Sequence, residues 1–134
     1  MKRFFLMTVL LLSALGMTFA DTYYDSQEEF DREWNAAANK YSFVCIAIEE
    51  VDDGDGTFAC DGTEEDGYLS YYYEGTKACV YAIFSNSMEI ISEYLEDEEF
   101  INKKWFTLRK QKEKAVKYWE RSIERVNIET ITIK

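Results

Sequence analysis

The stretch YLSYYYEGTKACVYAIFS, residues 68–85, decides the fold that the sequence predicts. Two runs of aromatic and β-branched residues, 68–73 and 77–85, flank a turn at Glu74, Gly75 and Thr76, which is typical of a β-hairpin. Upstream, residues 41–51 form a third such run and 57–60 a short fourth one. Four strands at this spacing predict an antiparallel meander.

Helical patterns flank these strands. Ser26 and Glu29 have the spacing of a capping box, and Phe30, Trp34, Ala37 and Ala38 follow at helical spacing, so we expect a helix from about Gln27 to Asn39.

Behind the hairpin, Asn86 is expected to cap a helix whose inner face is Met88, Ile91 and Leu95. A longer helix is expected from about Glu98 to Val126, with a closing strand over 127–133.

The long helix is predicted to be amphipathic. Its apolar arc contains Ile101, Trp105, Leu108, Ala115, Val116, Trp119, Ile123 and Val126. The opposite side carries Lys103, Lys110, Lys114, Lys117, Arg121 and Arg125. We interpret this basic stripe as a solvated face, with a site for an acidic partner or lipid as the alternative. The prediction is one α+β domain, residues 21–134, in which the N-terminal and C-terminal helices pack on one face of an antiparallel sheet of about four strands.

The first twenty residues have the order of a secretory signal peptide. Lys2 and Arg3 precede an apolar run from Phe4 to Leu15, and small residues lead to Ala20. This run is too short to span a bilayer stably. We therefore expect residues 1–20 to be a cleaved leader and the protein to be exported, either periplasmic or secreted.

The charge of the remaining chain is strongly negative and unevenly distributed. From residue 21 onward there are 13 basic and 26 acidic residues, a net charge of −13. Residues 21–100 hold 22 acidic and three basic residues, whereas 101–134 hold ten basic and four acidic ones. Such a chain is repelled by nucleic-acid phosphates and anionic lipid and attracts basic partners. The alternative is that the acidity serves solubility alone.

Three cysteines remain after the leader, and export favours one disulfide. Three pairings are possible. Cys45 lies inside the apolar run Phe43–Ile48 and is typical of a buried thiol, so the expected pair is Cys60–Cys79.

The sequence excludes several kinds of chemistry. It has no histidine, which removes imidazole-activated nucleophiles and imidazole zinc sites. It has no phosphate-binding glycine loop and no nucleophile-elbow motif. Its many carboxylates lie mostly in turns, and no two are marked as facing each other. We expect no enzyme, cofactor or resident metal.

Calcium is the one metal that the acidic turns suggest. Asp53, Asp55 and Glu64 fit positions one, three and twelve of an EF-hand loop, but Phe58 replaces the required glycine. An irregular calcium site between the two Asp/Gly turns therefore stays as an alternative to ordinary turn chemistry.

The candidate binding surface lies on the strand at 68–73 and on the acidic turn before it. Tyrosine is enriched at binding hot spots, and Tyr68 and Tyr72 share one face because strand side chains alternate. The expected surface is Tyr68 and Tyr72 ringed by Asp61, Glu64, Glu65 and Asp66. The alternative is that a helix covers this face.

These observations lead to one hypothesis and two rivals. The leading hypothesis is a small exported acidic protein that neutralises or escorts a basic protein, as inhibitors and immunity proteins do. The rivals are a structural protein that self-associates and an irregular calcium-binding protein. No nucleic-acid binding or membrane insertion is expected, and the oligomeric state stays open.

Overall fold

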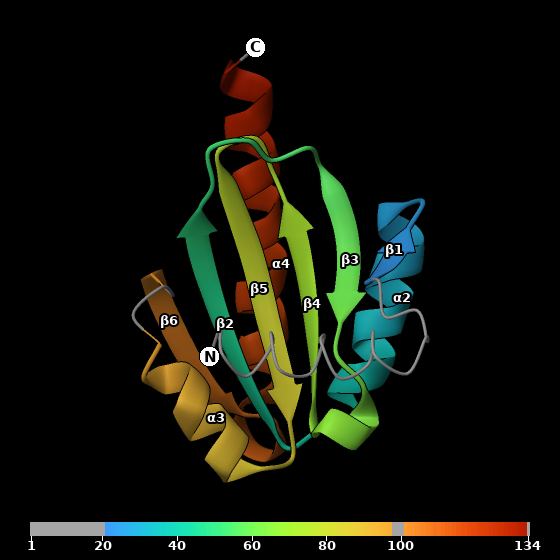
Figure 1. Cartoon of the computed structure of the whole chain (residues 1–134), viewed down its shortest axis with the longest axis vertical. Helices are drawn as coiled ribbons and strands as arrows, with labels where there is room; N and C mark the ends of the chain where they lie inside the picture. Colours follow the sequence, from blue (N-terminus) through green and yellow to red (C-terminus); the bar gives the residue numbers. More distant parts are fainter. Residues whose placement is uncertain (1–20, 98–100, 134) are drawn as a thin grey trace, which may run out of the picture.

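The computed structural model describes residues 21–97 and 101–133, which form an α+β fold built on one antiparallel sheet (Figure 1). The expected leader, residues 1–20, lies outside the described residues. The elements in chain order are β1 (Thr22–Tyr24), α2 (Gln27–Ala38), β2 (Phe43–Glu50), β3 (Thr57–Asp61), the 3-10 turn η1 (Glu64–Asp66), β4 (Tyr68–Glu74), β5 (Ala78–Ser85), α3 (Met88–Leu95), β6 (Ile101–Thr107) and α4 (Leu108–Ile133).

The sheet has six strands in the order β1-β3-β4-β5-β2-β6, so the expected four-stranded meander is only partly correct. Strands β3, β4 and β5 are consecutive, but β2 lies on the far side of β5, with Phe43 opposite Ser85. Strand β6 then pairs with the other edge of β2. The reason is the composition of β2. Its apolar run is continuous, and such a strand is stable in the interior of a sheet, where a strand pairs with each edge and both faces are buried.

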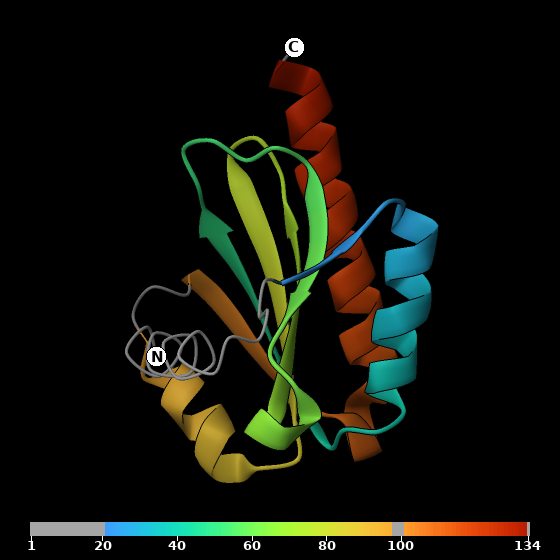
Figure 2. The same ribbon diagram turned by 45° about the vertical axis from the view of Figure 1, so that its right-hand side comes forward.

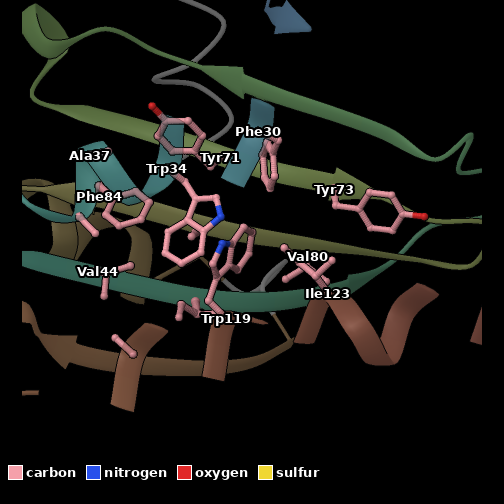
Figure 3. Packing of buried hydrophobic residues seen from close by; sticks show 14 of the residues in the cluster. Phe30, Trp34, Ala37, Val44, Tyr71, Tyr73, Val80, Phe84, Trp119 and Ile123 are labelled. Carbon is pink, nitrogen blue, oxygen red and sulfur yellow. The ribbon is translucent and has the colours of Figure 1, made fainter. Parts of the chain in front are cut away.

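Helices cover both faces of the sheet: α2 and α4 share one face, as expected for the N-terminal and C-terminal helices, and α3 lies on the other (Figure 2). Helices α2 and α4 pack on one face, where Trp34 and Trp119 meet edge to face at 6.1 Å and both approach Phe30 (Figure 3). Helix α3 packs on the other face, where Tyr94 contacts Tyr68 with ring centroids 5.8 Å apart.

The long helix begins ten residues later than predicted. The segment up to Thr107 is strand β6, because alternating side chains such as Trp105 and Phe106 complete the open edge of β2. Helix α4 starts at Leu108, whose backbone N–H donates to the Ser42 carbonyl at 2.8 Å. The expected closing strand at 127–133 is wrong, because α4 continues through it and extends past the sheet (Figure 1).

Helix α3 also differs in its cap and its buried face. Ser87, and not Asn86, is the N-cap, and its side chain accepts from the Ile90 backbone N–H. Asn86 instead accepts from the Ser42 backbone N–H at 2.7 Å. The helix buries Ile91 and Tyr94, and it leaves exposed two of the three residues expected inside.

The expected disulfide is wrong, because all three cysteines are free thiols. Cys60 faces α2 and α4 beside Tyr71, whereas Cys79 lies on the opposite face of the sheet beside Tyr72. Burial raises the pKa of the Cys45 and Cys60 thiols to about 12, and it raises the pKa of Cys79 as well. The thiols therefore stay protonated and unreactive near neutral pH.

Candidate functional site

The two tyrosines of the expected binding surface are buried. Tyr68 is 1% exposed beneath α3, and Tyr72 is 7% exposed. The Tyr72 ring packs on Tyr81, and its hydroxyl donates to the Asp21 carboxylate. Both rings are packed in the interior of the protein on this face of the sheet. The expectation of exposed tyrosine rings is therefore wrong.

The four acidic residues of that expected surface gather at one end of the β3–β4 hairpin. Asp61 ends β3, and Glu64, Glu65 and Asp66 form η1. Thr63 caps the turn by accepting from the Asp66 backbone N–H at 3.2 Å. Glu64 and Glu65 are exposed and Asp66 is half-buried.

Turn η1 packs directly against α3, and Gly67 makes this possible. Gly67 ends the turn with φ 87°, a left-handed conformation that glycine adopts without strain. A Cβ at this position would lie 2.5 Å from Ile90 Cδ1 of α3. The Ser85 hydroxyl also donates to the Gly67 carbonyl at 2.6 Å. The two acidic elements therefore form one continuous surface.

Helix α3 adds the apolar part of this surface. Met88 is 54% exposed and Leu95 is 42% exposed, and the three glutamates of the helix and its cap are exposed as well. We call this region the α3–η1 surface, and it consists of Glu64, Glu65, Asp66, Met88, Glu89, Glu93, Leu95 and Glu96. Sequence reasoning missed its α3 half, although one signal was present: residues 78–102 contain six acidic residues and no Lys or Arg.

A surface hollow of about 470 Å³ lies between the two elements. Its lining includes Tyr41, Glu64, Gly67 and Ser87. At its rim the Lys40 ammonium pairs with Glu64 at 3.3 Å, and both side chains are mostly exposed. Exposed ion pairs of this kind contribute little to stability, so a partner's cation can replace Lys40 at small cost.

Next to this surface, Asp21 and Asp61 form a carboxylate pair. Thr22 lies opposite Cys60 in the β1–β3 register, so one step further brings Asp21 opposite Asp61. Burial, reinforced by Asp21 and the hydrogen bond between the two side chains, raises the pKa of the Asp61 carboxyl from 3.8 to about 6. The Gly62 backbone N–H, at 2.9 Å, partly offsets this effect.

The expected calcium frame does not assemble. Asp53 and Asp55 lie in the turn between β2 and β3, whereas Glu64 lies beyond the far end of β3 (Figure 1). The two acidic turns are therefore separated by the length of a strand. Within the described ranges, no three acidic or cysteine side chains are grouped as a metal site requires.

No match was found among protein-family models, curated proteins or solved structures. In the part of the chain that the structure describes, no helix has the length and apolarity to cross a membrane.

Proposed function

We propose that the protein is a small exported acidic binding protein that neutralises or escorts a basic protein partner, in the manner of inhibitors and immunity proteins. The observation that carries the proposal is the α3–η1 surface. It exposes Met88 and Leu95 among six carboxylates. Exposed apolar side chains beside a group of like charges are the composition expected of an interface with a polar rim.

Lys40 and Lys103 offset only part of the charge of this surface. Lys40 is committed to Glu64 at the rim of the hollow. Lys103 of β6 donates to the carbonyls of Tyr94 and Leu95 at the end of α3. A partner that presents lysine or arginine next to an apolar patch would complement the remaining carboxylates and the exposed Met88 and Leu95. Electrostatic attraction of this kind raises the association rate and makes it sensitive to salt.

Export is part of the proposal and rests on the pattern of residues 1–20. It places the protein where basic hydrolases and toxins are encountered, and where a small protein without catalytic apparatus acts by occupying another protein's surface.

Affinity capture tests this function directly. The chain from residue 21 is immobilised, exposed at low salt to the extracellular or periplasmic fraction of its source, and eluted with a salt gradient. The expected result is one dominant basic protein, retained in stoichiometric amount until high salt. A mixture of basic proteins released together at modest salt would contradict the proposal, because it would show that the acidity acts as general surface charge.

Self-association is the second candidate, and strand β6 is the observation that favours it. This seven-residue strand lies at one end of the sheet order, with β2 as its neighbour, and such edges can pair with another chain. Exposed Lys104 on the same strand opposes such pairing. Light scattering without any partner distinguishes the two candidates, because only self-association predicts a mass that rises with concentration.

A further inference from the structure

The two carboxylates of Asp21 and Asp61 lie close together, and a positive charge beside them would stabilise the pair. Asp21 and Asp61 face each other across β1 and β3, and the Tyr72 hydroxyl is already committed to Asp21. Like charges directly opposite on paired strands destabilise a sheet. A half-buried pair of this kind is stabilised by a shared proton or by a neighbouring cation.

The groups that face Asp61 are acidic or neutral. From β1 it faces Asp21, from η1 the Asp66 carboxylate, and from β4 the Tyr68 phenol, which contacts Tyr94 of α3. A further acidic group, Glu74, is close enough to be affected by Asp21: its pKa is raised by burial and then by Asp55 and Asp21. Among the described residues, no lysine or arginine is a partner of the pair.

We propose that the missing cation is the α-ammonium group of Asp21 itself, released when the leader is removed. Hydrolysis of the Ala20–Asp21 peptide bond by a signal peptidase consumes one water. It leaves a carboxylate on Ala20 and an amine on Asp21, which takes up a proton at neutral pH. This inference rests on the export part of the proposed function.

Covalent geometry makes the position specific. The new ammonium is attached to the same Cα as one of the two interacting side chains, and the pairing of Thr22 with Cys60 holds that residue against β3. Leader removal therefore adds one positive charge next to the two carboxylates. A residue added before Asp21 moves the ammonium by about one residue length, about 3.8 Å, and loses this match.

The test compares three proteins that contain every described element: the chain that begins at Asp21 with a free amine, the same chain acetylated at that amine, and a chain with one added N-terminal glycine. The Asp61 pKa is measured in each by NMR of the carboxyl carbon. With the free amine we expect a pKa near the ordinary value of an aspartate. With the acetylated amine we expect a pKa near 6, and with the added glycine a value between the two.

Thermal unfolding at pH 7 provides a second readout. The free-amine chain is expected to melt several degrees above the acetylated chain, and Asp61→Asn is expected to remove most of that difference. Equal Asp61 pKa values in the free and acetylated chains would overturn the proposal. Intact-mass analysis of the natural exported protein tests the cleavage site separately, so a failure of the export proposal is distinguished from a failure of the ion pair.

Discussion

At the scale of single residues, Asp61 shows how a side chain can be placed where its charge is unfavourable. Burial and the facing Asp21 carboxylate favour the protonated form in the folded chain. The unfolded chain has no such environment, so the folded state binds the proton more tightly. In a chain whose Asp21 amine is blocked, the contribution of this group to stability is therefore fully present below about pH 4 and is lost as the pH rises through 6.

We predict that Asp61→Asn removes this pH dependence. The comparison uses chains whose Asp21 amine is blocked. At pH 7.5 the variant should have a higher melting temperature than the wild type, because the amide cannot ionise. At pH 4 the two melting temperatures should be close. Differential scanning calorimetry across this range measures the effect. A constant offset between the two proteins at all pH values would contradict the account.

Gly67 makes a second prediction at this scale. Gly67→Ala should lower the free energy of unfolding by about 2–5 kcal/mol, since a left-handed residue with a Cβ costs about 1–2 kcal/mol and overpacking against Ile90 adds about 1–3 kcal/mol. Gly56→Ala is the matched control, because Gly56 has φ 79° and its added Cβ would have its nearest neighbour, Tyr73 Oη, at 3.8 Å. Urea unfolding of both variants tests this, and equal losses would show that η1 does not pack on α3 as described.

At the scale of elements, the sequence predicted the strands of the hairpin well and the segment after α3 poorly. Trp105 fits the apolar arc of a helix by spacing, yet it lies on β6. Periodicity over one segment cannot show that β2 has an open edge waiting for a partner, and that long-range pairing overrides the local pattern. The same limit explains Met88 and Leu95, because only the docking of Ile91 and Tyr94 decides which side of α3 is buried.

The candidate site was predictable to a similar degree. The acidity of the turn at 61–67 is visible in composition, and four of the six expected residues do gather at that turn. The burial of Tyr68 and Tyr72 is not visible, because tyrosines in a strand have the same pattern whether a helix covers them or not.

The Lys103 side chain joins two elements, and we predict that its loss destabilises the fold. Its ammonium donates to the Tyr94 and Leu95 carbonyls at 3.0 and 2.9 Å, and this ties β6 to the end of α3. Lys103→Met should lower the free energy of unfolding by about 1.5–3 kcal/mol, the range for hydrogen bonds from a charged donor. Lys104→Met, on the exposed position next to it, should change it by less than about 0.5 kcal/mol. Urea unfolding measures both, and an equal effect of the two substitutions would contradict this role.

At the scale of the whole molecule, charge is separated along the chain and over the fold. Residues 21–100 hold 22 of the 26 acidic residues, whereas α4 has a basic outer side with Lys110, Lys114, Lys117 and Arg121 exposed. A molecule with such a separation presents opposite charges to a partner on different sides and so favours one orientation of approach. The α3–η1 surface is the acidic region that also exposes apolar side chains.

The most direct test of the binding proposal is the dissociation constant for the captured basic partner, measured by calorimetry for three proteins. These are the wild type, a Glu89→Lys/Glu93→Lys variant on α3, and an Asp52→Lys/Asp53→Lys variant in the β2–β3 turn, which changes the net charge equally at the other end of the sheet. We predict that the α3 variant weakens binding at least a hundredfold, whereas the turn variant weakens it less than tenfold. Equal weakening by the two variants would contradict a defined α3–η1 interface and leave only non-specific attraction.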